Sequence, residues 1–237
     1  GTLSFCGKTN MALTVSSTSL TATDVCAFSN LMTKISVPCS FGSLIVGDGV
    51  ATGPTTVDFS DAPSFAVSGL TQLSRGKLVL PACAQLGALD LSGWAQVVLK
   101  ADDEGNMPSI GALRLTGSTH DLQIDGGTVD ALPVSGDVTL SNLGATDFFS
   151  GFSGGYTFGS LYVSGGTPTI RDADSLTAGS LWNRDGSNLQ IANVQTVECG
   201  SITNSNGNSR FTVSDVENLT VSRQVYFSNG SGNFLFA

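Results

Sequence analysis

Apolar residues recur along the chain in one spaced pattern, Φ-x-Φ-x-x-Φ-x-x-Φ-x-Φ, where Φ is an apolar residue. The clearest copy runs from Leu189 to Cys199 and is followed by Gly-Ser-Ile. A second copy begins twenty-two residues later, at Phe211. Earlier copies fit at 57–67 and at 89–99, and Trp94 takes an apolar position in the latter. Such self-similarity at a fixed interval predicts a repeat architecture.

A short opener, glycine followed two residues later by an apolar residue, marks where each repeat begins. Openers start at Gly42, Gly76, Gly111, Gly136, Gly159, Gly179 and Gly200. The later intervals settle near 20 to 25 residues, which is typical of a solenoid. We therefore predict an all-β fold, a right-handed parallel β-helix of about eight coils over residues 42–237, with coils about 4.8 Å apart.

Apolar residues three apart would also share one face of a helix, so a helical repeat is the alternative. The repeats are rich in Val, Ile, Thr, Ser and Asn, and Gly or Pro flanks them. These residues favour strands and tight bends over helix. We therefore expect two short strands joined by a bend, with the apolar positions facing inward.

Residues 1–41 are expected to form an N-terminal cap and a first irregular coil, continuous with the repeats as one domain. A cap covers the apolar side chains and strand edges at a solenoid end. Cys6, Cys26 and Cys39 crowd this segment and predict at least one disulfide, in an oxidising compartment. Buried free thiols are the alternative. Cys199 takes an apolar position of its repeat and is expected to be a small core residue.

The frame Ile191-x-x-Val194-x-x-Val197-x-x-Gly200-x-Ile202 resembles the repeat of receptor L domains. These are the leucine-rich β-solenoids of insulin- and EGF-receptor ectodomains and of fungal cell-wall proteins of the sporulation and Ecm33 type. The resemblance covers most of residues 42–237 as a spacing pattern. It implies a leucine-rich-repeat-like module that presents a rigid surface and carries out no reaction.

Composition and charge exclude several classes of partner. Hydrophobic residues make up 41% and charged residues only 12%, with a net charge of −9. Nucleic-acid binding needs a basic footprint, and docking on anionic lipid needs positive charge, so neither is expected. No apolar run is long enough for a membrane span. Sequons at Asn218 and Asn229 mark candidate N-glycosylation sites of a secreted glycoprotein.

The longer repeats predict loops inserted at 47–54, 101–108 and 148–156. The last of these is aromatic, and we take Phe148, Phe149, Phe152 and Tyr156 as contact residues for a partner. The alternative is that these rings fill a wide coil. The chain ends on an apolar strand at 233–237, so we expect a longer chain, a covering partner or stacked copies.

The acidic clusters are the places where an enzyme of this fold would carry its catalytic groups. Asp172 and Asp174 beside Arg171 are the best candidates, because glycosidases need paired carboxylates. Asp61-Ala takes the matching place in an earlier repeat, which favours a structural bend. The run from Asp102 to Glu104 is expected to be a solvated turn. The single histidine, His120, stands beside Asp121 without the geometry of a triad.

The first hypothesis is thus a non-enzymatic extracellular or cell-surface adhesion module, which uses a rigid solenoid surface for protein, glycan or self-association. It predicts no catalytic residue, metal or cofactor. One alternative is a carbohydrate-active β-helix enzyme or glycan-binding protein. Another is a self-assembling wall or filament subunit.

Overall fold

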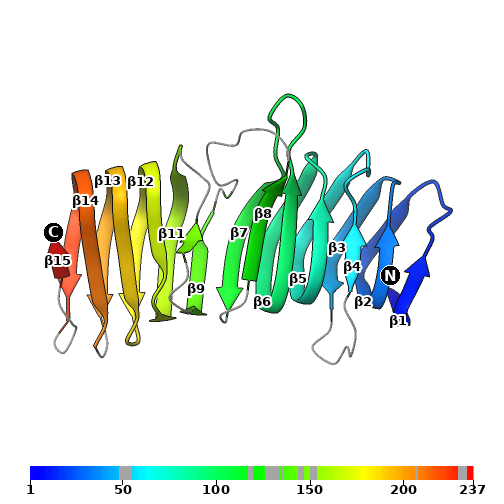
Figure 1. Ribbon diagram of the computed structural model, residues 1–237, viewed down its shortest axis with the longest axis horizontal. Helices are drawn as coiled ribbons and strands as arrows, with labels where there is room; N and C mark the ends of the chain where they lie inside the picture. The colour runs from blue at the N-terminus through cyan, green and yellow to red at the C-terminus, as the bar shows by residue number, and fades with distance from the viewer. Residues whose placement is uncertain are drawn as a thin grey trace. The chain divides into compact units, whose positions relative to one another are not determined.

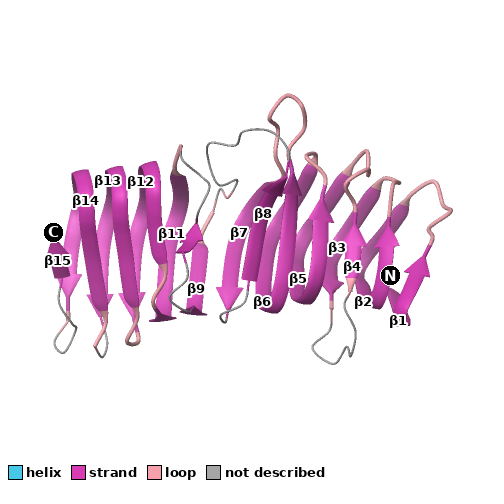
Figure 2. Cartoon of the chain, in the orientation of Figure 1, coloured by secondary structure: helices cyan, strands magenta, loops and turns pink. Residues whose placement is uncertain are grey.

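The computed structural model describes residues 1–47, 55–116, 120–125, 134, 136–143, 147–149, 154–205, 208–228 and 234–236. Across these residues the chain forms a parallel β-solenoid of about nine turns, which confirms the all-β solenoid prediction. In the described ranges all the regular secondary structure is β-strand, and there is no helix (Figure 2). By internal contacts the chain divides into unit 1, residues 1–112 and 119–129, and unit 2, residues 113–118 and 130–237.

Unit 1 consists of parallel strands laid side by side from the N-terminus onward (Figure 1). Residues 1–41, expected to form a cap, contribute strands that pair in the same parallel manner as the later ones. The strands are β1 (Leu3–Leu13), β2 (Leu20–Lys34), β3 (Cys39–Val46), β4 (Thr56–Asp58), β5 (Phe65–Leu80), β6 (Ala84–Lys100) and β8 (His120–Asp125). The division between the units falls within β7 (Ser109–Thr116).

Unit 2 is more regular, and its longest strands pair in sequence order (Figure 1). Ile170 pairs with Ile191, and Ile191 with Val213, so equivalent positions form columns across the turns. Its strands are β9 (Val138–Leu143), β10 (Asp147–Phe149), β11 (Tyr156–Gly166), β12 (Thr169–Arg184), β13 (Asn188–Ser205), β14 (Arg210–Phe227) and β15 (Phe234–Phe236).

The inward columns of unit 2 bear out the repeat frame. Every apolar position in the clearest copy is buried: Leu189, Ile191, Val194, Val197, Cys199 and Ile202. Alternate side chains of a strand point to opposite faces, and a bend at Asn193 shifts the alternation by one residue. Each buried aliphatic side chain contributes about 1.5–3 kcal/mol through removal from water. The columns therefore hold successive turns together.

The core of unit 1 differs because phenylalanine rings fill much of it. Phe59 and Phe65 pack with their ring centroids 4.6 Å apart, and Phe41 meets Phe65 edge-on at 5.9 Å. Phe28 meets Phe59 edge-on at 6.0 Å. Offset and edge-to-face contacts of this kind add about 0.5–1.5 kcal/mol each beyond burial. Bulky rings let unit 1 fill its interior although its turns vary in length.

One predicted opener is wrong. Leu44 pairs with Thr71, and Thr71 with Leu89, whereas Leu78 pairs with Val97. Gly76 therefore does not open the turn after Gly42. The corner glycines of unit 1 instead lie at positions 42, 69, 87 and 111, each placed against the backbone of the turn before it. Two corners replace the one that was predicted, so there are about nine turns instead of eight.

Trp94 is a second departure from the repeat frame. Its side chain is 71% exposed, although the frame placed it inward. Gly93 has a positive φ of 64° and turns the chain there, so Ala95 takes the buried position. Glycine adopts this backbone conformation without the strain that a side chain brings. The bend falls at the same place in the repeat as Asn193, but here the next buried residue follows it by two positions instead of one.

The predicted disulfide among Cys6, Cys26 and Cys39 is also wrong. All five cysteines lie in described residues and are free, and no two are at disulfide distance. The register explains this, because Cys6 pairs with Ser29 while Cys26 pairs with Leu3 on one side and Leu44 on the other. The alternative of buried free thiols holds for Cys26 and Cys39, and Cys199 is a buried core residue as predicted.

These thiols give the first testable prediction. Burial raises the pKa of Cys26 and of Cys39 to about 12 and that of Cys199 to about 11, so little thiolate forms at pH 8. The thiolate is the reactive form. At pH 8, we expect Ellman's reagent to label the exposed Cys6 and Cys83 quickly and the other three only after unfolding. Fewer than five thiols in denaturant without reductant would show that a disulfide exists.

Candidate binding face

The predicted acidic pair sits at a bend of unit 2. Asp172 has a positive φ of 57°, and Asn193 and Asp215 hold the same conformation in the next two turns. Asn193 Nδ2 donates a hydrogen bond of 2.7 Å to Asp172 Oδ1, and Arg171 Nε lies 3.3 Å from Oδ2. Asp and Asn tolerate this conformation best among residues with side chains. Asp172 therefore belongs to a column of bend residues that link successive turns.

The acidic loop after β6 is closed by its own hydrogen bonds. Asp102 accepts hydrogen bonds from the backbone amides of Glu104, at 3.0 Å, and Asn106, at 2.7 Å. Hydrogen bonds from the Asn106 side chain and backbone lower the pKa of the Asp102 carboxyl below its ordinary value. This is a solvated turn, as predicted. Within the described ranges, no group of three or more His, Cys, Asp or Glu could hold a metal ion.

Of the four aromatic residues predicted to contact a partner, the structure describes the side chain of Tyr156. Tyr156 is only 1% exposed, and its ring packs 6.1 Å from that of Phe158, so it belongs to the core. Burial raises the pKa of its hydroxyl well above the ordinary value. Phe148 and Phe149 belong to β10, whose side chains lie outside the described part, as does Phe152. The alternative, a ring that fills the coil, therefore holds for Tyr156.

Of the two candidate N-glycosylation sites, the structure describes one. Asn218 lies on β14 with its side chain exposed, in register with Thr196 of β13. Asn229 lies outside the described residues. Exposure leaves Asn218 accessible for the predicted modification, which stays a prediction.

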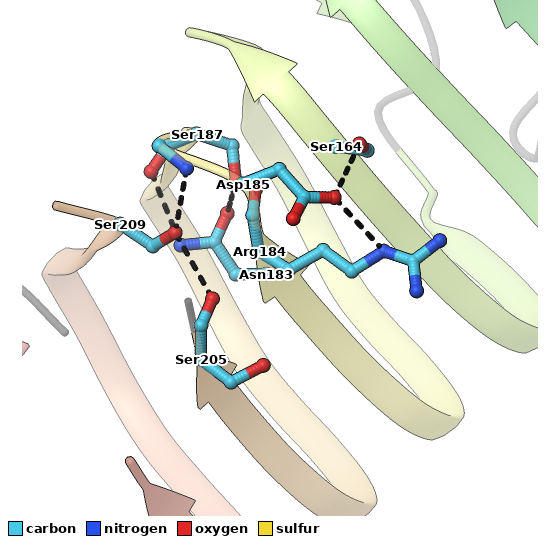
Figure 3. Close-up of polar contacts among 8 residues, drawn as sticks. Ser164, Asn183, Arg184, Asp185, Ser187, Ser205 and Ser209 are labelled. Atoms are coloured by element: carbon cyan, nitrogen blue, oxygen red, sulfur yellow. Dashed lines mark hydrogen bonds and ion pairs between the residues drawn. The ribbon is translucent and has the colours of Figure 1, made fainter. Parts of the chain in front are cut away.

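A buried polar ladder that the sequence analysis missed joins the turns of unit 2. Asn183 and Asn204 are both buried and occupy one inward column. Asn183 Nδ2 donates to Asn204 Oδ1 and to the Arg210 carbonyl oxygen, each at 2.8 Å. Ser187 donates to Asn183 Oδ1 at 2.5 Å (Figure 3). Buried polar groups that are satisfied in this way fix the register of neighbouring turns.

An ion pair and hydrogen bonds also stabilise the outer side of this corner. Arg184 Nε lies 3.3 Å from Asp185 Oδ2, and Ser164 of the preceding turn donates to that oxygen at 2.8 Å (Figure 3). Behind them, the Gly186 amide donates to Ser209 Oγ at 3.0 Å. Asp185 thereby compensates the charge of Arg184. This corner presents a neutral ion pair to solvent.

Next to this corner lies a surface column that carries exposed aromatic rings. The register places Tyr162, Trp182, Thr203 and Tyr226 in succession across β11, β12, β13 and β14. The rings of Tyr162 and Trp182 stack, with centroids 6.2 Å apart and planes inclined by 22°. Trp182 is 37% exposed and Tyr226 is 48% exposed. We call these four residues the aromatic column.

The columns that flank the aromatic column are made of hydroxyl and amide side chains. Ser201 donates to Ser180 at 3.0 Å within one of them. The first flank consists of Ser160, Ser180, Ser201 and Gln224, and the second of Ser141, Ser164, Arg184 and Ser205. Arg184 is the only charged residue among them, and Asp185 pairs with it. The first flank continues into Asp137 of β9, and Arg223 lies beside Gly200 at its edge. Over the described residues of β11 to β14 this surface is therefore aromatic and rich in hydroxyl groups, with few charges and both signs among them.

Unit 1 offers a different concave feature. An open groove of about 530 Å³ follows its glycine corners, and no residue that lines it is ionisable. Small polar side chains contribute to its walls, among them Thr21, Thr23, Ser40, Ser68 and Gln85. Its one aromatic lining residue, Phe41, is buried in the core, and no acidic residue lines it. The aromatic column is therefore the stronger candidate for a site.

Comparison of the chain with protein-family models, with curated proteins and with solved structures gives no match. The likeness to L domains is thus one of repeat spacing. Among the described residues there is no helix long and apolar enough to cross a membrane. The candidate site accordingly rests on the geometry of unit 2.

Proposed function

We propose that the chain is a non-enzymatic extracellular or cell-surface module that binds its ligand on the aromatic column of unit 2. The observation that carries this proposal is the stacked pair formed by the half-buried Tyr162 and the exposed Trp182. Tyr and Trp are enriched at binding surfaces because they bring a large apolar area with little conformational entropy to lose. Parallel pairing of the turns fixes the spacing of these side chains before a ligand arrives.

Several features of the sequence support the wider setting. The low content of charged residues and the exposed sequon at Asn218 fit a secreted glycoprotein. The repeat spacing fits an L-domain-like module of the kind found in receptor ectodomains and fungal walls. Adhesion through a fixed surface, without turnover, is the activity that such an arrangement favours. The carboxylate of Asp172 serves a bend, which supports a role in the fold in place of catalysis.

Binding and turnover can be measured together. Immobilised wall polysaccharides and a second copy of the chain are tested by biolayer interferometry, and release of reducing ends is followed in parallel. We expect saturable binding without release. The triple variant Tyr162→Ala, Trp182→Ala, Tyr226→Ala should lose the binding, while Trp94→Ala in unit 1 should keep it. Unchanged binding by the triple variant would overturn the proposal. So would a release of reducing ends by the parent protein that the Asp174→Asn variant no longer shows.

A further inference from the structure

The aromatic column contains a gap of defined size. Trp182 and Tyr226 lie two turns apart, and Thr203 is the only residue of the column between them. Turns are spaced about 4.8 Å apart, so the two aromatic positions are separated by roughly 9.6 Å. A flat ring stacked on an aromatic ring sits roughly 4.5 to 7 Å from it. The gap therefore matches one ring held between two aromatic side chains, with Thr203 beneath.

The first side of this gap is already held in place. Tyr162 stacks on the face of Trp182 that is turned away from Thr203, since the register order is Tyr162, Trp182, Thr203. Support of this kind lowers the entropy that the Trp182 side chain loses when a ligand binds. The opposite face of Trp182 is directed along the column toward the gap. The first wall is thus oriented before a ligand arrives.

The charges around the gap limit the kind of ligand that it can bind. The flanking columns carry mostly hydroxyl and amide groups, and Asp185 compensates the charge of Arg184. The other charges that adjoin them, Asp137 and Arg223, are opposite in sign. Acidic side chains gather on a separate stretch of the same strands, at Asp174, Glu198 and Glu217. With a net charge of −9, the chain repels acidic polymers. A neutral ligand with apolar faces and a polar rim fits best.

We infer that the gap between Trp182 and Tyr226 binds a neutral hexose unit of a polysaccharide. A pyranose ring has apolar C–H faces, which would stack on the two aromatic rings, and hydroxyls around its rim. Serine and glutamine side chains in the flanking column, Ser180, Ser201 and Gln224, lie where those hydroxyls would emerge. This inference rests on the proposed function and names the ligand of the same surface.

The two tryptophans of the chain make a direct test possible. In a Trp94→Phe protein, Trp182 is the sole tryptophan, so its fluorescence reports contact at the gap. Soluble oligosaccharides of glucose and of mannose are titrated, with oligogalacturonate as the acidic probe. We expect a saturable blue shift with at least one neutral probe and none with the acidic one. Tyr226→Ala in this background should weaken binding about tenfold or more.

The decisive variant is Thr203→Tyr, which fills the gap and extends the aromatic column. It should abolish the fluorescence response while the melting temperature stays within a few degrees of the parent. Retained neutral binding by this variant, equal binding of oligogalacturonate, or no response to any neutral probe would overturn the inference. If neutral sugars fail but Trp182→Ala still abolishes adhesion to a protein surface, only the ligand class is wrong. If Trp182→Ala changes no interaction at all, the proposed function falls too.

Discussion

Gly200→Ala is expected to destabilise unit 2 by about 3 kcal/mol, because the added methyl has no space. A Cβ at Gly200 would overlap the carbonyl oxygen of Gly179 in the preceding turn, and a Cβ at Gly179 would overlap that of Gly159. These neighbours are backbone atoms of a paired ladder, so they cannot rotate away as a side chain could. The turn would have to separate from its neighbour at this corner.

Thermal unfolding followed by far-ultraviolet circular dichroism measures this effect. For a chain of this length, about 3 kcal/mol lowers the melting temperature by roughly 6 to 12 °C. Gly105→Ala is the control, since a Cβ there meets nothing within 4 Å. Its positive φ adds only about 1–2 kcal/mol of backbone strain. A Gly200→Ala protein that melts within two degrees of the parent would contradict the close approach of the turns.

Asn183→Leu is expected to cost roughly 3 kcal/mol, although leucine has the same number of side-chain heavy atoms with the same branching. The substitution removes the donor to Asn204 Oδ1 and to the Arg210 carbonyl, and the acceptor for Ser187. Each buried polar group that is left without a partner costs about 1–3 kcal/mol. Chemical denaturation of the variant against the parent gives the loss. Gln195→Leu, at an exposed position of β13, is the matched control and should change little.

A double-mutant cycle tests whether the two asparagines act together. Val163 and Phe227 occupy the same column in the turns on either side, so the column accepts apolar residues. Asn183→Leu together with Asn204→Leu should therefore cost at least about 1 kcal/mol less than the two single changes added. Strict additivity would show that the hydrogen bond between the two side chains contributes nothing to stability.

The fold of unit 2 was predictable because its repeats are nearly uniform in length. Its inward columns follow directly from the apolar spacing, and corner glycines recur at Gly159, Gly179 and Gly200. In unit 1 the same reasoning misplaced one corner, since Gly76 precedes the same short apolar pattern as Gly42. A glycine that opens a turn and a glycine elsewhere in a turn look alike in the sequence. Only the strand register distinguishes them.

The candidate site was largely missed, for a related reason. Tyr162 and Trp182 follow the inward Leu161 and Leu181, so their outward direction could have been derived from alternation. Whether exposed rings in adjacent turns meet depends on side-chain rotamers, which periodicity does not contain. Trp94 shows the reverse error, because a single bend moved a predicted core residue to the surface. The buried polar ladder could have been predicted, because asparagine occurs at the same position of two successive repeats, as Asn183 and Asn204.

The columns of unit 2 also determine how this part of the chain can fold during synthesis. Ile170 meets Ile191, and Ile191 meets Val213, so each turn finds its whole partner surface in the turn made just before it. Pairings between residues so near in sequence form without closing long loops. Growth can thus proceed one turn at a time as the ribosome releases the chain, each finished turn serving as the template for the next.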